Sequence, residues 1–149
     1  MALELGLDDI TSYVGKELGH SAWLEIDQKR VNDFADATGD HQWIHVDVAR
    51  ATKEMGGTIA HGYLTLSLIP FLSKDIYQLK GVSRGINYGL NKVRFTNMVK
   101  TGSKIRTVAK LVEAIPRAGG LQMTVEITIE IEGENRPACV AQTVSLLYA

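Results

Sequence analysis

The second half of the chain alternates apolar and polar residues with the period of a β-strand. Between Gln122 and Glu132 every second side chain is apolar, and Gln, Glu and Thr fill the positions between them. This pattern is typical of a strand with one face in the core and one in water. Turn residues flank it at 118–120 and 132–135. We predict further strands at about 86–95, 104–114 and 138–147, which together form an antiparallel meander.

The first half of the chain has helical spacing instead. Asp27 is a suitable N-cap for a helix whose apolar residues recur at helical intervals and which stops at Gly39. We expect a loop at 40–46 after it. Asp47 then caps a short helix at 48–55. The chain is therefore predicted to begin with helices and to end with strands.

A third segment, Tyr63 to Leu72, carries apolar residues on every face. A helix without a polar side is buried all round. Pro70 is expected to kink this helix or to mark its last turn. A long twisted sheet curled around one buried helix is the economical packing of these parts. The sequence thus predicts an α+β fold, with residues 1–149 forming a single domain.

Composition narrows the class of protein. The chain has 149 residues, of which 45% are hydrophobic and 22% charged, with a net charge of −1, an ordinary globular balance. No basic field is present that would attract nucleic acid or an anionic membrane. The single cysteine, Cys139, excludes an intramolecular disulfide. The N-terminal residues lack a signal-peptide pattern and no segment could span a bilayer, so we expect a cytoplasmic protein.

Candidate chemistry first appears in the stretch T-G-D-H-Q-W-I-H-V-D at 38–47, which places Asp40 and His45 on one short loop. An imidazole titrates near neutrality. If both side chains touch one water, they can remove a proton from it and return one to a substrate. Taken alone, these two residues are explained more simply by an aspartate that caps a turn and a histidine that is hydrogen-bonded within the loop.

A second element, His61-Gly62, stands at the start of the apolar helix. The first amides of a helix have no intrahelical acceptor, and a glycine leaves room for a substrate carbonyl to approach such an amide. A donor fixed in a dry site stabilises an oxyanion well. The alternative is that Gly62 only permits tight packing at the helix start.

Other kinds of site find less support. His41, His45 and His61 could suggest a metal, but no thiolate joins them and the first two lie in a predicted loop, so we expect no metal site. The sequence contains no phosphate-binding loop, no dinucleotide-binding glycine motif and no G-x-S-x-G nucleophile motif.

The two stretches together resemble the MaoC-like family, the (R)-specific enoyl-CoA hydratases of the hotdog fold. Several members carry G-D-x-N-P-[LI]-H followed by a helix that opens in H-G. In this chain Gln42 and Trp43 replace the usual Asn-Pro, a variant that resembles a branch including nodulation-protein-N-like proteins. The segment Lys92–Gly102 is similar to the family's R-F-x-x-P-V-x-x-G. The matching positions in the two motifs are Gly39, Asp40, Ile44, His45, His61 and Gly62.

The resemblance implies a reaction and roles for particular residues. Asp40 and His45 would hold the catalytic water, and the Gly62 amide would bind the thioester carbonyl. The reaction would be the reversible syn hydration of a trans-2-enoyl-CoA to a (3R)-hydroxyacyl-CoA, without a metal or redox cofactor. We assign substrate binding to three further residues, which are Gln42, His61 and Arg94; the last of these could meet the phosphates of coenzyme A.

Alternatives remain open at this stage. The same chemistry in reverse would make the protein a 3-hydroxyacyl-ACP dehydratase, whose partner is an acyl carrier protein. A hotdog acyl-CoA thioesterase shares the fold but does not need the spacing of Asp40 and His45. A non-catalytic acyl-thioester-binding module belongs to a different class. Because a half-open sheet leaves an edge strand to be paired, we expect a homodimer. The resemblance implies that the acyl channel lies at the subunit junction.

Overall fold

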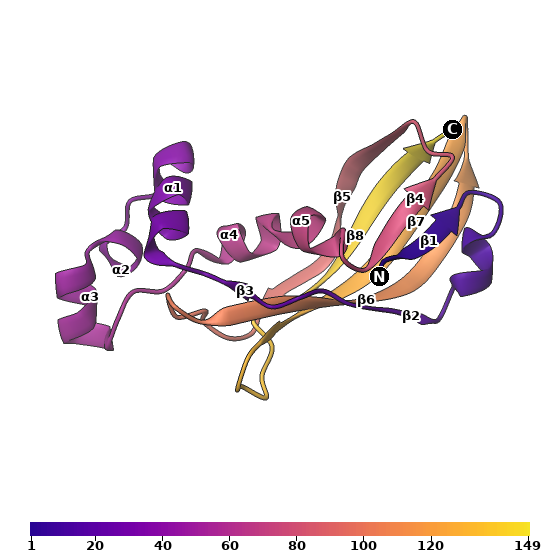
Figure 1. Ribbon diagram of the computed structural model, residues 1–149. Coiled ribbons are helices and arrows are strands. Elements are labelled where there is room, and N and C mark those ends of the chain that lie inside the picture. Colours follow the sequence, from indigo (N-terminus) through magenta and orange to yellow (C-terminus); the bar gives the residue numbers. More distant parts are fainter.

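The computed structural model describes all residues, 1–149, and its centre is a strongly curved antiparallel sheet (Figure 1). The strands follow one another across the sheet in the order β2-β6-β7-β8-β5, and β3 also pairs with β6. Helices α4 and α5 lie along this sheet, while α1, α2 and α3 gather beyond one of its ends (Figure 1). The strand bounds are β2 Glu17–His20, β3 Leu24–Glu25, β5 Arg84–Phe95, β6 Lys104–Arg117, β7 Gly120–Ile131 and β8 Cys139–Tyr148.

The predicted meander is right for three strands and wrong for the fourth. Strands β6, β7 and β8 are consecutive antiparallel neighbours. Strand β5 pairs with β8 rather than with β6, and Phe95 lies opposite Cys139. The alternation of side chains sets which face of a strand is buried but carries no information on its neighbours. As a result β5 forms one edge of the sheet.

The helices near the N-terminus begin and end where their caps predict. In α1 (Gln28–Thr38) the Asp27 side chain accepts a hydrogen bond from the Arg30 amide at 2.8 Å. In α3 (Val48–Met55) Asp47 does the same for the Arg50 amide at 3.1 Å. The predicted loop between them is wrong in part, because residues Trp43–Val46 form a single helical turn, α2.

The prediction of a helical N-terminal part also missed several short strands. Strands β2 and β3 join the main sheet, and β1 (Leu3–Gly6) pairs in parallel with β4 (Tyr77–Lys80). A short 3₁₀ turn, Ile10–Tyr13, follows β1. These strands have two or four residues each, too few for a period of two to stand out from the sequence.

The central helix is interrupted, as Pro70 predicts, into α4 (Gly62–Ser67) and α5 (Ile69–Ser73). Its complete burial is a wrong prediction. Four apolar residues of the two helices pack into the core, but Tyr63 is 71% exposed and Phe71 is 54% exposed. One side of the helix pair therefore faces the sheet, and the other is uncovered in the single chain. The buried residues are Leu64, Leu68, Ile69 and Leu72.

One cluster of 25 buried residues forms the core and runs from Leu5 in β1 to Leu147 in β8. The inward side chains of β7 lie at its centre, with Val125, Ile127 and Ile129 almost wholly buried. Each buried aliphatic side chain contributes roughly 1.5–3 kcal/mol of transfer free energy. No helix of this structure is long and apolar enough to cross a membrane.

Candidate active site

Asp40 and His45 lie close together on the segment that joins α1 to α3. Asp40 follows Gly39, whose φ of 85° ends α1 in the left-handed conformation, and His45 lies on the single turn α2. The side chain of Asp40 is 52% exposed, whereas His45 is only 6% exposed. One ligand atom each of Asp40, His45 and His61 lies within 4.8 Å of the others. At this spacing the carboxylate and the His45 imidazole can both hydrogen-bond one water.

The orientation of the His45 ring is set by a backbone carbonyl. Its Nδ1 lies 2.7 Å from the carbonyl oxygen of Ile59. Because a carbonyl oxygen only accepts, Nδ1 carries a proton and donates it. In the neutral ring Nε2 is then the unprotonated nitrogen. This leaves Nε2 with the lone pair that a general base requires.

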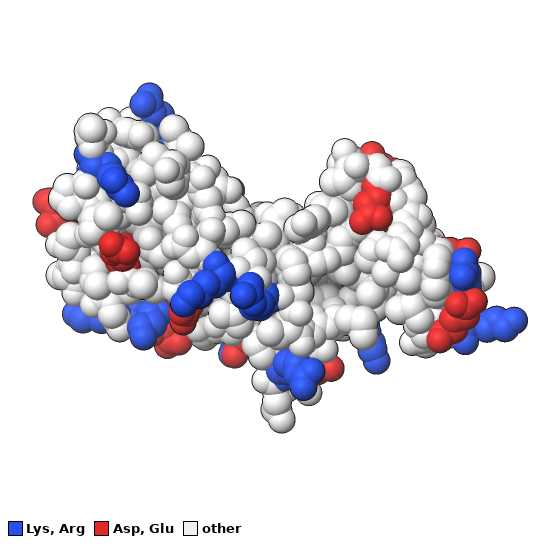
Figure 2. Space-filling model, turned by 180° about the vertical axis from the view of Figure 1, so that it is seen from behind, with Lys and Arg blue, Asp and Glu red and all other residues white.

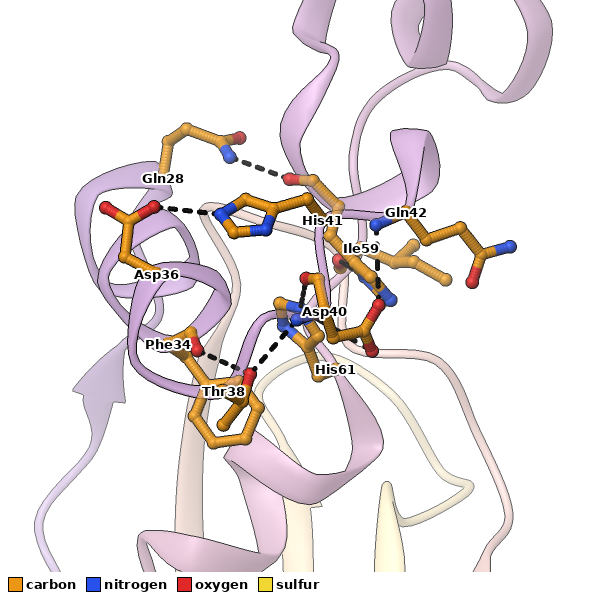
Figure 3. Close-up of polar contacts among 10 residues, drawn as sticks. Gln28, Phe34, Asp36, Thr38, Asp40, His41, Gln42, Ile59 and His61 are labelled. Atoms are coloured by element: carbon orange, nitrogen blue, oxygen red, sulfur yellow. Dashed lines mark hydrogen bonds and ion pairs between the residues drawn. The ribbon is translucent and has the colours of Figure 1, made fainter.

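His61 is buried and contacts both Asp40 and His45. It is 3% exposed, and its Nε2 donates a hydrogen bond to the backbone carbonyl of Asp40 at 3.0 Å (Figure 3). Its ring stacks on the ring of His45, with centroids 3.8 Å apart and planes inclined by 22°. The Asp40 carboxylate lies 4.0 Å from the same Nε2. His61 therefore contacts the other two residues rather than the open cavity.

Asp40, His45 and His61 are residue types that bind transition metals, but the orientation of the two rings does not favour a shared metal ion. A metal ion lies in the plane of every imidazole that binds it. The planes of His45 and His61 are nearly parallel, so their lone pairs do not converge on one point. One nitrogen of each ring is also taken by a backbone carbonyl. The arrangement suits water activation better than metal binding.

His41 belongs to a different contact. Its Nε2 lies 3.0 Å from Oδ1 of Asp36 on α1 (Figure 3). The hydrogen bond that His41 donates to the Asp36 carboxylate raises the pKa of His41 above its usual value. His41 therefore pairs with α1, away from His61.

Gly62 meets His45 at a cavity of about 350 Å³. It is the first residue of α4, so its amide has no intrahelical acceptor. The ring of Phe95 covers the glycine closely, since a Cβ at this position would lie 3.2 Å from that ring. The cavity thus brings together the His45 side chain and a glycine at a helix start. Its other lining residues are Ile59, Ala60, Thr65, Phe95, Thr96, Asn97, Met98, Val99, Arg136 and Ala138.

Several predicted residues lie elsewhere. The Gln42 side chain points away from Asp40 (Figure 3), and the contact between the two residues is a hydrogen bond of 3.4 Å from the backbone N–H of Gln42 to Oδ1 of Asp40. Arg94 donates a hydrogen bond to the carbonyl of Val93 and does not line the cavity. Among apolar residues in or near the matching motifs, Ile59 and Met98 line the cavity with His45, whereas Leu64 belongs to the core and Met55 lies outside the cavity.

Two polar residues of the cavity, Asn97 and Arg136, escaped the sequence reasoning. Arg136 lies on the turn between β7 and β8, and Asn97 follows β5. Asn97 donates to the carbonyl of Arg136 and to the carboxylate of Glu134. Turn residues after a strand carry no periodic signal, so only the fold brings these two side chains to His45.

Comparison with known proteins gives a consistent picture. The family described as MaoC like domain matches residues 9–134. A 3-hydroxyacyl-thioester dehydratase Z of Mycobacterium tuberculosis is 50% identical over 138 residues, which cover 91% of this chain and 91% of that protein. Nodulation protein N of Rhizobium leguminosarum is 46% identical over 148 residues, covering 97% of this chain and 92% of that protein.

Solved structures resemble the fold over nearly its whole length. A monoamine oxidase regulatory protein from Archaeoglobus superposes with a TM-score of 0.79 at 22% identity, covering 100% of this chain and 99% of that one. An (R)-hydratase from A. caviae superposes with a TM-score of 0.70 at 22% identity, covering 89% and 94%. The predicted α+β hotdog fold is confirmed, as is the predicted resemblance to nodulation protein N. The chain belongs to the MaoC-like domain family.

Proposed function

We propose that this protein is a hydro-lyase that adds water to a trans-2-enoyl thioester and gives the (3R)-hydroxyacyl thioester. The observation that carries the proposal is the position of Asp40 and His45. Their polar atoms lie within 4.8 Å of each other, and His45 lines a cavity that Gly62 also lines. The 50% identity to a protein named 3-hydroxyacyl-thioester dehydratase Z supports this chemistry.

The proposed mechanism follows from the three groups. A water held between the Asp40 carboxylate and Nε2 of His45 loses a proton to this pair as its oxygen bonds to C3 of the enoyl group. The negative charge moves to the thioester oxygen, which the Gly62 amide stabilises with a hydrogen bond. The proton then passes to C2. Because one pair of groups handles both the water and the proton, the two additions occur on the same face.

The reverse reaction uses the same groups, since a dehydratase takes the identical path backwards. The carrier of the acyl group is a separate question. A coenzyme A thioester and an acyl-carrier-protein thioester present the same enoyl group to Asp40 and His45, and the two differ only beyond the pantetheine arm. We take coenzyme A as the first carrier to test and the carrier protein as the second.

We further propose that the active protein is a homodimer paired through β5. This strand of 12 residues is the edge of the sheet, and unpaired edges are normally covered. The face opposite to that of Figure 1 has a hollow between its two lobes with few charged side chains (Figure 2). Exposed apolar residues lie on β5 and on the adjacent helices, namely Tyr63, Phe71, Ile86, Tyr88, Leu90 and Phe95.

A larger groove, of about 720 Å³, runs between the helix pair and β5. Leu66 and Ile69 line it from the helices, and Ile86 and Leu90 line it from the strand. Apolar walls of this kind suit an acyl chain. A second subunit paired along β5 would cover the groove, which is why we place the acyl channel at the subunit junction.

The direct test is to mix the purified protein with crotonyl-CoA and to follow the absorbance of the conjugated thioester. Loss of conjugation with the thioester intact, and a (3R)-hydroxy product on a chiral column, supports the proposal. Activity should survive a chelator, because no step uses a metal. Release of free thiol would indicate a thioesterase. Binding without turnover, for longer enoyl chains and for carrier-protein thioesters as well, would indicate a binding module.

A further inference from the structure

We propose that Gln28 and Thr58 are positioning residues for His45, and this inference rests on the proposed role of His45 as the base. Neither residue lines the cavity or contacts Asp40. Both belong to a hydrogen-bond circuit that surrounds the turn on which His45 lies. The circuit joins three segments that are distant in the sequence.

The circuit can be followed atom by atom. Gln28, the first residue of α1, donates from Nε2 to the carbonyl oxygen of His45 at 2.8 Å (Figure 3). Its other amide atom, Oε1, accepts from the hydroxyl of Thr58 at 2.6 Å. Thr58 is covalently joined to Ile59, whose carbonyl accepts from Nδ1 of His45 at 2.7 Å. The Ile59 amide closes the circuit by donating to the carbonyl of Ile44 at 3.0 Å.

The direction of each hydrogen bond is fixed by what the groups can donate. A hydroxyl has one hydrogen, and the Gln28 oxygen can only accept, so Thr58 donates to Gln28. The hydroxyl of Thr101, 2.7 Å from that of Thr58, must then be the donor to Thr58. The second Nε2 hydrogen of Gln28 goes to Asn32 at 2.9 Å. Both hydrogens of the Gln28 amide are thus occupied, and the amide has one orientation.

The circuit matters because α2 has only four residues. A single helical turn is unstable by itself, so neighbouring segments must hold it in place. The circuit contacts His45 twice: Gln28 donates to its main-chain oxygen, and the carbonyl of Ile59 accepts from its ring Nδ1. If the Thr58 hydroxyl is lost, Oε1 of Gln28 loses its donor and the amide can turn away from the carbonyl of His45. The α2 turn can then shift relative to the carbonyl of Ile59, and the ring is freed to take the other tautomer. Nε2 would then carry the proton and could no longer act as a base.

The decisive substitution is Thr58→Val, which keeps the shape of the side chain and removes only the hydroxyl. Thr58→Ser restores the hydroxyl and is the rescue variant. Thr107→Val is the matched control, because Thr107 is equally buried and its hydroxyl has no hydrogen-bond partner. Gln28→Glu is the second variant: it keeps the acceptor for Thr58, removes the donor to His45, and places its charge favourably at a helix start.

Two measurements are made on each variant: steady-state kinetics with an enoyl thioester, and the tautomer of His45 from its ring ¹⁵N chemical shifts. In Thr58→Val we expect kcat to fall roughly 10- to 100-fold with KM little changed, as expected for a misplaced catalytic group. We also expect His45 to shift partly to the Nε2–H tautomer. Thr58→Ser and Thr107→Val should match the wild type in both measurements, and Gln28→Glu should behave like Thr58→Val.

Wild-type kinetics and an unchanged His45 tautomer in both Thr58→Val and Gln28→Glu would overturn the inference. A loss of activity in Thr107→Val equal to that in Thr58→Val would also overturn it, since it would reflect a general effect on the core. The tautomer measurement needs no substrate. If the wild-type protein turns over no enoyl thioester, the proposed function fails while the positioning of His45 is still decided by NMR.

Discussion

The ring of Phe95 lies over Gly62 so closely that a Cβ on the glycine would sit 3.2 Å from it. Gly62 has no positive φ, so an alanine there is acceptable to the backbone. The effect of Gly62→Ala therefore falls on the cavity rather than on the helix. We expect turnover to fall while the melting temperature stays at or above that of the wild type.

The check is steady-state kinetics beside thermal unfolding of the same variant. Adding Phe95→Leu to Gly62→Ala should recover part of the loss, because it removes the ring that the new methyl group displaces. Undiminished kinetics in Gly62→Ala would remove the oxyanion role from this residue.

Asp40→Asn tests the carboxylate that is proposed to hold the water. The substitution keeps size and removes the charge, and the side chain is half exposed, so the free energy of unfolding should change by only about 0.5 kcal/mol. We expect kcat to fall on the order of 100-fold or more. Asp36→Asn is the matched control, because Asp36 contacts His41 and not His45. A nearly fully active Asp40→Asn variant would contradict the water-activation assignment.

His45→Gln tests the imidazole in the same way. Glutamine can keep a hydrogen bond to the carbonyl of Ile59 but supplies no ring nitrogen that could accept the proton of the water. A loss on the order of 100-fold or more in kcat is expected, measured on protein shown to be folded by circular dichroism. His41→Gln should leave kcat unchanged, since His41 turns towards α1. Equal losses in the two variants would speak against a specific role for His45.

His41 gives a pH-dependent signal of its own. Its pKa is raised, chiefly by the hydrogen bond that its ring donates to the Asp36 carboxylate. A raised folded-state pKa contributes stability at pH below the unfolded value, and this contribution is lost as the pH rises through the folded value. In Asp36→Asn the pKa of His41 should move down towards its ordinary value, as followed by NMR titration. The group is exposed, so salt should shrink the difference. An unchanged titration would show that the Asp36 contact is absent in solution.

Leu90→Arg tests the proposed pairing through β5. Leu90 is 41% exposed at the edge of the sheet, so an arginine is tolerated in one subunit but is placed near its copy in a two-fold pair. We expect the mass in sedimentation to change from that of a dimer towards that of a monomer. Val48→Arg, on exposed α3, is the matched control. A dimer that persists in Leu90→Arg would place the interface elsewhere.

Helix caps and the alternation of apolar and polar residues predicted the elements that depend on residues close in the sequence. Asp27 and Asp47 cap helices because a side-chain oxygen reaches an amide three residues on. The alternation along β7 reports its own burial. Neither the caps nor the alternation carries information on residues distant in the sequence. The pairing of β5 with β8 and of β1 with β4 could therefore not be predicted. The exposed side of the helix pair escaped prediction for the same reason, since apolar residues there look like core residues.

The site divides in the same manner. Asp40, His45 and Gly62 were found because they lie in two short motifs with fixed spacing. Gln28 and Thr58 were missed because Gln28 contacts His45 across 17 residues and Thr58 contacts Gln28 across 30. Arg136 reaches the cavity only through the turn that follows β7. Spacing along the chain thus identified the groups proposed to react, and three-dimensional packing was needed to find those that hold them.

His61 links the three groups of the proposed mechanism. Its ring stacks on that of His45, its Nε2 donates a hydrogen bond to the main-chain carbonyl of Asp40, and its peptide bond joins it to Gly62. His61 therefore contacts or directly adjoins all three groups of the proposed mechanism, which are His45, Asp40 and Gly62. A shift at the start of α4 would therefore be transmitted to His45 and Asp40 through the side chain of His61. Replacing His61 would remove the stacking contact with His45 and the hydrogen bond to the carbonyl of Asp40 at once. One substitution would thus loosen both residues relative to Gly62.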